Sequence, residues 1–143
     1  MKLQVSMGQS DLAGYTNIDV LKSPIDLGKL DDVCEEAECT HIILNNVLKF
    51  IPYQQIPIVL QHIGSRLRHK GKITLMFHDL NNIVRSYNVA ELDETKLNST
   101  MFGQGYRSCF SHNYITHIIQ TLKLDIVSIN INKTQTIINI ERP

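Results

Sequence analysis

The chain has 143 residues, which suits a single domain with one hydrophobic core. Its 14 Lys and Arg residues balance its 14 Asp and Glu residues, so the net charge does not indicate a nucleic-acid partner. No apolar run has the length of a membrane span, and the start, MKLQVSMGQ, lacks the apolar segment of a signal peptide. We therefore expect a single compact domain over residues 1–143, in the cytoplasm and with no membrane partner.

The three cysteines do not suggest a metal site or a disulfide framework. Cys34, Cys39 and Cys109 are an odd number, and their spacing contains no C-x-x-C pair. We interpret them as reduced thiols, which fits a cytoplasmic protein, and we expect no metal.

The first third of the chain is typical of short strands joined by loops. Residues 2–6 suit a buried strand, residues 17–20 a second, and residues 25–27 a third short extended piece. The acidic stretch 31–39 suits a surface segment with a helical turn. The β-branched run at 41–44 is typical of a central strand.

A helix is predicted from Pro52 onward. Its apolar residues recur at helical spacing, at Ile56, Val59, Leu60, Ile63 and Leu67. Gly71 is expected to end this helix, and residues 72–77 then suit another apolar strand. Asp79 is placed to cap a short helix that runs through Tyr87.

The last third contains a long polar segment and a hairpin. Residues 88–111 are predicted to be an irregular loop, and loops of this length are often functional. Residues 113–122 show one apolar helical face. The tail from residue 125 alternates as a strand does, with a turn at Asn132-Lys133, so it predicts an antiparallel hairpin.

Strands that alternate with helices, followed by a hairpin, predict an α/β fold with a mostly parallel sheet. Ligands of such sheets bind beyond the carboxyl ends of the strands. The positions to consider are therefore Ser6–Gln9, Asp19, Asp26, Asn45–Asn46 and Phe77–Asp79.

The order of these segments resembles the class I S-adenosylmethionine-dependent methyltransferases, especially their short bacterial and phage members. LQVSMGQ is loosely similar to the family's glycine-rich turn after the first strand, and AGYTNID is closely similar to the segment that ends the second. NNVLKFI, SRLRHKGK and CFSHNYITHIIQTLKLDIVSI resemble later segments in the same order. The resemblance covers nearly the whole chain. It implies a three-layer Rossmann-like sheet with a C-terminal antiparallel hairpin, and S-adenosylmethionine as cofactor.

The resemblance also implies roles for the first two strand ends. Ser6, Met7, Gly8 and Gln9 would face the methionine part of the cofactor, where close approach of the backbone favours glycine. Asp19 would accept hydrogen bonds from two ribose hydroxyls, because a carboxylate offers two acceptor oxygens.

Further along, the resemblance implies that Asp26 and Leu27 would meet the adenine. Asn45 and Asn46 would line the wall near the methionine and the transferring methyl group. Each also has a structural interpretation, because Asp commonly forms turns and paired asparagines are frequent in loops.

The sequence departs from the family pattern at two places. Ser6 stands where the first glycine is expected, and Lys49 and Phe50 replace a Glu-His pair. A general base at that pair is therefore not available. Catalytic residues are not identified by the sequence, and the candidates for a base are His78 and Asp79, followed by Tyr106 and His112.

Two functional hypotheses follow. The first is a methyltransferase acting on a small molecule, a sugar or a protein side chain. The alternative is a catalytically degenerate protein of this fold that serves as a binding or assembly module. The retained Gly8, Asp19 and Asp26 favour the first, and Ser6 with Lys49 favours the second. The short chain also favours a self-associating form, a homo-oligomer.

Overall fold

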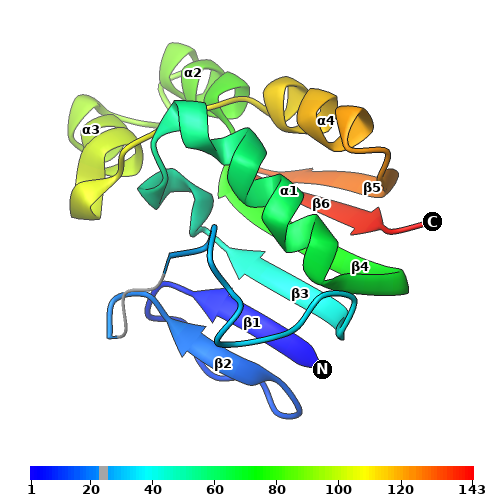
Figure 1. Ribbon diagram of the computed structural model, residues 1–143. Coiled ribbons are helices and arrows are strands. Elements are labelled where there is room, and N and C mark those ends of the chain that lie inside the picture. Colours follow the sequence, from blue (N-terminus) through cyan, green and yellow to red (C-terminus); the bar gives the residue numbers. More distant parts are fainter. Residues whose placement is uncertain (23–25) are drawn as a thin grey trace.

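The computed structural model describes residues 1–22 and 26–143 (Figure 1). Within these residues one sheet contains β1 (Lys2–Ser6), β2 (Thr16–Asp19), β3 (Cys39–Asn45), β4 (Leu67–His78), β5 (Asp125–Asn132) and β6 (Gln135–Glu141). The helices are α1 (Ile56–Arg66), α2 (Leu80–Asn88), α3 (Glu94–Phe102) and α4 (His112–Thr121). The 3-10 turns are η1 (Leu48–Phe50), η2 (Tyr53–Gln55) and η3 (Gly103–Gly105).

The strand order is β2-β1-β3-β4-β6-β5. The β2-β1, β1-β3 and β3-β4 pairs are parallel, whereas β6 runs antiparallel to both β4 and β5. The predicted α/β fold, a mostly parallel sheet with a C-terminal antiparallel hairpin, is therefore confirmed. The parallel half brings the carboxyl ends of β1, β2 and β3 together at one edge.

The hydrophobic core lies between one face of the sheet and the helices. Alternate strand residues provide the sheet side of this core, among them Leu3, Val5, Ile42, Leu44, Ile73 and Leu75. The predicted stripe of α1 and the apolar face of α4 provide the other side, with Ile56, Leu60, Ile63, Ile115 and Ile119. Figure 1 shows α1 and α4 on the same side of the sheet. One continuous core thus joins the sheet to one layer of helices.

The opposite face of the sheet carries a hydrogen-bonded row of polar side chains. The hydroxyl of Tyr15 lies 2.7 Å from Nδ1 of His41, and Nε2 of His41 lies 2.9 Å from Oγ1 of Thr74. Thr74 donates to Asn139 over 3.0 Å, and Asn139 donates to Ser128 over 2.9 Å. Of the three layers expected, the described residues build the sheet and one helical layer. On the other face, the polar side chains of this row satisfy one another's hydrogen bonds.

The boundary between α1 and β4 differs from the prediction. The helix ends at Arg66, and Gly71 lies inside β4 rather than at a helix end. A Cβ at Gly71 would lie 2.9 Å from the carbonyl oxygens of both Arg68 and Cys39. Glycine is therefore required there by the close approach of β3, a cause that the sequence does not reveal.

Two other segments also differ. Residues 88–111 are not one irregular loop, because α3 and η3 lie within them and the Asp93 side chain caps α3 by accepting from the amide of Lys96 over 2.8 Å. The extended piece predicted at 25–27 is wrong for Asp26 and Leu27, which lie in a turn, and Ile25 is outside the described residues.

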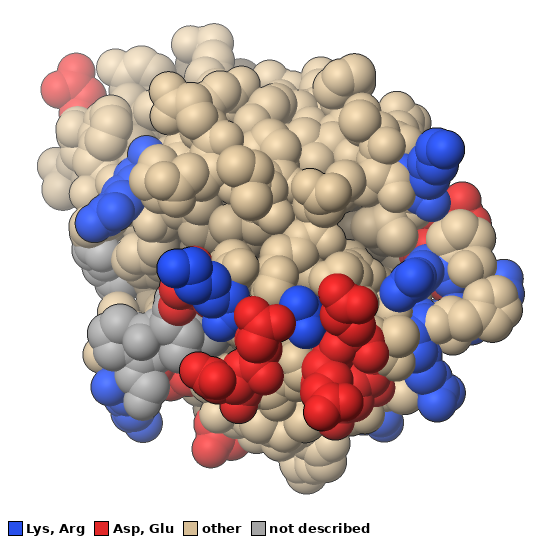
Figure 2. Space-filling view, in the orientation of Figure 1, with Lys and Arg blue, Asp and Glu red and all other residues tan. Residues whose placement is uncertain are grey.

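The acidic stretch is a surface segment, as predicted. Figure 2 shows acidic side chains gathered on the lower part of the viewed face, and all five acidic residues of the 31–38 segment are exposed: Asp31, Asp32, Glu35, Glu36 and Glu38. Asp31 pairs with the buried Arg66 over 2.9 Å. None of the described helices combines the length and the apolarity that crossing a membrane requires.

Candidate functional site

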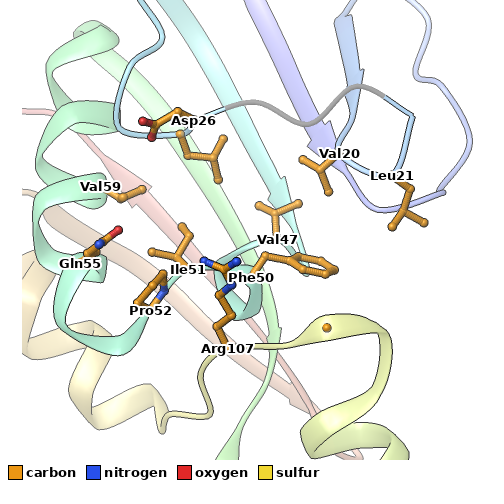
Figure 3. Close-up of a pocket in the computed structure, with 12 residues that line it drawn as sticks. Val20, Leu21, Asp26, Val47, Phe50, Ile51, Pro52, Gln55, Val59 and Arg107 are labelled. Carbon is orange, nitrogen blue, oxygen red and sulfur yellow. The ribbon is translucent and has the colours of Figure 1, made fainter.

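A pocket of about 440 Å³ opens beyond the carboxyl ends of β2 and β3 (Figure 3). Its walls come from the segments that follow these two strands, from the start of α1 and from the segment after α3. The lining residues are Val20, Leu21, Asp26, Leu27, Val47, Phe50, Ile51, Pro52, Gln55, Val59, Gly105 and Arg107. The pocket therefore lies where parallel α/β sheets bind their ligands.

Asp19 ties the turn after β1 to the end of β2. Its Oδ1 accepts from the amide of Gly8 over 3.1 Å and from the amide of Leu21 over 2.9 Å. The amide of Val20 donates to the carbonyl of Ser6 over 2.9 Å. In the described part of the chain no group donates to Oδ2 of Asp19. Asp19 thus has a structural role through Oδ1, and it lies outside the pocket lining, directly before the lining residue Val20.

The turn after β1 lies beside the pocket rather than in its lining. Gly8 has a φ of +75°, a conformation that glycine adopts without strain. Ser6 is 2% exposed and belongs to the interior, and the amide of Met7 donates to the Gln9 side chain over 2.6 Å. Leu21 connects this turn to the pocket, because a Cβ at Gly8 would lie 3.4 Å from it.

Two of the predicted residues, Asp26 and Leu27, line the pocket directly. Figure 3 places the Asp26 carboxylate at one side of the opening and Arg107 at another. Oδ1 of Asp26 accepts from the amide of Gly28 over 2.9 Å, so this aspartate also forms the turn that its sequence context suggested. Leu27 is buried and contributes to both the pocket and the core.

Asn45 ends β3, Asn46 forms the bend that follows, and the next residue, Val47, lines the pocket. Asn46 has a φ of +58° and donates from its amide to the carbonyl of Met76 over 2.8 Å. Its side-chain amide donates to Asn45 over 2.9 Å, which leaves Oδ1 of Asn46 buried with no described partner. The pair directs the chain toward the pocket but does not line it.

Of the two first candidates for a base, Asp79 is built into the fold. It is fully buried, caps α2 by accepting from the amide of Asn81 over 3.0 Å, and accepts from Thr136 over 3.1 Å. It also pairs with His112 at the start of α4. Because no solvent-accessible surface remains, Asp79 is not placed to take a proton from an acceptor.

His78, the other candidate, is half-buried at the end of β4. Its Nδ1 lies 2.9 Å from the hydroxyl of Thr134 in the β5–β6 turn. Burial, and next the charge of Lys49, lower the pKa of His78 to about 4, so the ring is neutral near neutral pH. The pocket lining includes neither His78 nor Tyr106, and the latter covers Lys49 instead.

The structure adds functional candidates that the sequence did not identify. Arg107 and Phe50 line the pocket, and Lys49 is 1% exposed beneath the segment that carries Arg107. The carbonyl of Lys49 accepts from the amides of Arg107 and Ser108, over 2.6 and 3.1 Å. These backbone bonds place Arg107 at the pocket. The only sequence signal was the departure at Lys49 and Phe50.

No family model and no curated protein matches the sequence. Among solved structures, an O-methyltransferase family protein from Burkholderia thailandensis is 13% identical with a TM-score of 0.64, over 99% of this chain and 44% of that chain. A 1,6-didemethyltoxoflavin-N1-methyltransferase from the same organism, with bound 1,6-didemethyltoxoflavin and S-adenosylhomocysteine, is 12% identical with a TM-score of 0.62, over 98% and 70%.

A magnesium protoporphyrin IX methyltransferase from Synechocystis PCC 6803, with bound S-adenosylhomocysteine, is 14% identical with a TM-score of 0.56, over 90% of this chain and 52% of that chain. The chain thus spans only about half the length of two of these three proteins. At such low identity the likeness is one of fold. The chain has the Rossmann-like fold of S-adenosylmethionine-dependent methyltransferases.

Proposed function

We propose that this chain binds S-adenosylmethionine in the pocket beyond β2 and β3 and acts as a methyltransferase. The observation that carries the proposal is the convergence of Asp26, Leu27 and Val47 on one pocket at the carboxyl ends of parallel strands. The similar fold of proteins solved with S-adenosylhomocysteine supports it. The acceptor is a small molecule, a sugar or a protein side chain, and the cytoplasmic location is part of the proposal.

The pocket suits an adenosine group in both size and chemistry. Its volume of about 440 Å³ lies in the range of small-ligand sites. Val20, Val47 and Val59 provide apolar walls for a purine, and the Asp26 carboxylate offers acceptor oxygens for its amine. Asp19 directly precedes the lining residue Val20, and its Oδ2, to which no described group donates, suits a hydroxyl donor of the ligand.

Arg107 suits the other end of the same ligand. It is an exposed guanidinium on the pocket's rim, across from Asp26 in Figure 3, and it can form two parallel hydrogen bonds with a carboxylate. When bound, the cofactor supplies an activated methyl group for in-line displacement. The task of the protein is then to bind and orient the reactants, for which a dedicated base is not always required.

The alternative, a non-catalytic binding or assembly module, is favoured by one observation. Asp79 is fully buried and hydrogen-bonded, so a leading candidate for a base is inaccessible. His78, which is neutral near pH 7, is the remaining candidate close to a strand end. The two hypotheses share the cofactor pocket and differ only in turnover.

The decisive experiment is calorimetric titration with S-adenosylmethionine and, separately, with S-adenosylhomocysteine. We expect saturable one-site binding of both. Asp19→Ala should weaken binding by about 1.5–3 kcal/mol through loss of hydrogen bonds to a charged acceptor. Asp32→Ala is the matched control, because Asp32 is an exposed carboxylate of the acidic 31–38 segment and does not lie at the end of a strand. The cofactor affinity of this variant should match that of the wild type.

The outcomes separate the hypotheses. No binding of either compound at millimolar concentration would refute the cofactor proposal. Unchanged affinity in Asp19→Ala would remove the ribose role of that residue. Binding of both compounds, without methyl transfer to any member of an acceptor panel, would favour the binding module.

A further inference from the structure

The outermost strand of the sheet, β5, has an irregularity between Ile126 and Ser128, but beyond it the strand carries neither a charge nor a proline to protect the exposed edge. It is hydrogen-bonded to β6 on one side, and it is the last strand in the order β2-β1-β3-β4-β6-β5. Edge strands of native proteins commonly carry a lysine, a proline or an inward-pointing charge that prevents pairing with another chain. Residues 126–132, IVSININ, contain no charged residue and no proline.

The same strand exposes a row of large apolar side chains. Val127 is 62% exposed, Ile129 41% and Ile131 50%. Ile129 pairs with the buried Ile138 of β6 and Ile131 with the buried Thr136, so these two side chains continue the face of the sheet that carries the core, whereas Val127 lies at the irregularity between Ile126 and Ser128. An alternating apolar row beside unpaired backbone groups is the pattern that a further strand covers.

We propose that β5 pairs antiparallel with β5 of a second copy of this chain, about a twofold axis at Ile129. In this register Ile129 faces its own counterpart, and each Val127 faces an Ile131 of the other copy. On the opposite face, each Ser128 meets an Asn130. Every apolar residue of the row thus has an apolar neighbour across the strand pair.

Charges at the ends of the strand favour the same register. Asp125 begins β5 and is exposed, and Lys133 follows its last residue in the hairpin turn. Pairing about Ile129 brings each Asp125 to the end of the interface that carries the other copy's Lys133, so opposite charges meet at both ends. A slip that centres the axis on Ser128 would place Asp125 opposite Ile131 and remove this match.

The resulting dimer is isologous, as most homodimers are, because both copies contribute the same surface. It joins two six-stranded sheets into one continuous sheet. The pocket follows β2 and β3 in the other half of the sheet and stays open. The inference therefore does not depend on the proposed function.

The bulge between Ile126 and Ser128 bends the strand locally, which places the strongest pairing over 128–130.

Sedimentation velocity over a wide concentration series tests the proposal. We expect the wild type to sediment as a dimer and Ile129→Lys as a monomer of half the mass, because two lysines would face each other at the axis. Ile58→Lys is the matched control, since Ile58 is 65% exposed on α1, away from β5, and this variant should remain dimeric. Circular dichroism of both variants reports whether each has folded.

A charge exchange tests the register itself. Asp125→Lys alone and Lys133→Asp alone should each weaken the dimer, and the double variant should restore it, because each copy then supplies both partners. Ile129→Cys should form an interchain disulfide on oxidation, whereas Ser128→Cys should not. A wild type that is monomeric throughout, a dimeric Ile129→Lys or a double exchange that fails to restore pairing would overturn the proposal.

Discussion

The ammonium group of Lys49 lies 4.8 Å from the centre of the Tyr106 ring and donates to the carbonyl of Thr100 over 3.0 Å. Within residues 1–22 and 26–143, no carboxylate lies in ion-pair contact with it. The side chain is 1% exposed, and burial lowers the pKa of Lys49 from 10.5 to about 8. This amine therefore holds α3 and Tyr106, the residue after η3, against η1 while it carries an unfavourable buried charge.

Replacing Lys49 with methionine should change how stability depends on pH. Because the folded-state pKa lies below that of the unfolded chain, the folded state binds fewer protons between about pH 8 and 10.5, and stability rises with pH across this window. The rise is on the order of 3 kcal/mol, from about 1.4 kcal/mol per pKa unit. Urea unfolding of Lys49→Met should lack this rise. If the free energy of unfolding of the wild type and of the variant changed with pH in parallel, the prediction for Lys49 would be contradicted.

His78 should make the protein sensitive to acid. Its pKa is lowered from 6.5 to about 4, so the unfolded state takes up a proton first as the pH falls, and stability decreases between about pH 6.5 and 4. His78→Gln keeps a polar group opposite Thr134 and cannot titrate. Thermal unfolding at pH 7 and pH 4.5 should show that the melting temperature falls less in this variant than in the wild type. An equal fall in both proteins would refute the role of His78 in acid sensitivity.

Gly71→Ala should destabilise the protein, whereas Gly64→Ala should not. The new Cβ at position 71 meets backbone oxygens at 2.9 Å, so β3 or β4 must shift, and we expect a loss of about 1–3 kcal/mol. At position 64, inside α1, the new Cβ lies 3.4 Å from Cδ1 at the end of the Leu124 side chain, and alanine favours the helix by about 1 kcal/mol. Chemical denaturation of both variants checks the contrast.

Asp79→Ala should cost more stability than Asp93→Ala, although both residues cap a helix. Asp93 is exposed, and losing its cap costs about 1 kcal/mol. Asp79 is fully buried and also accepts from Thr136 and pairs with His112, so its loss leaves buried polar groups unsatisfied and should cost about 3–5 kcal/mol. Similar denaturation midpoints for the two variants would show that this network contributes little.

Several elements could be predicted because the signal that forms them is local. The apolar runs of β1 and β3, the stripe of α1, the Asp79 cap and the alternation of the terminal hairpin are all written in adjacent residues. The α3 helix was missed although its cap at Asp93 is local too, because the polar residues around it lack an apolar period.

The candidate site was predictable in part. The sequence placed Asp26 and Leu27 at a ligand site, and the pocket lining contains both. Arg107 and Phe50 could not be predicted, because backbone hydrogen bonds to Lys49 bring their segments together from distant parts of the chain. The burial of Asp79 was equally hidden, since the residues that cover it come from β6 and α4.

The sequence by itself determined the six strands, the helices α1, α2 and α4 and their order, because hydrophobic period, caps and turn residues act over a few neighbours. The tertiary structure alone decided that Gly71 lies within a strand, that Lys49 is buried beneath Tyr106, and that β5 is the outer edge. These features depend on contacts between residues far apart in the chain, which no local pattern encodes.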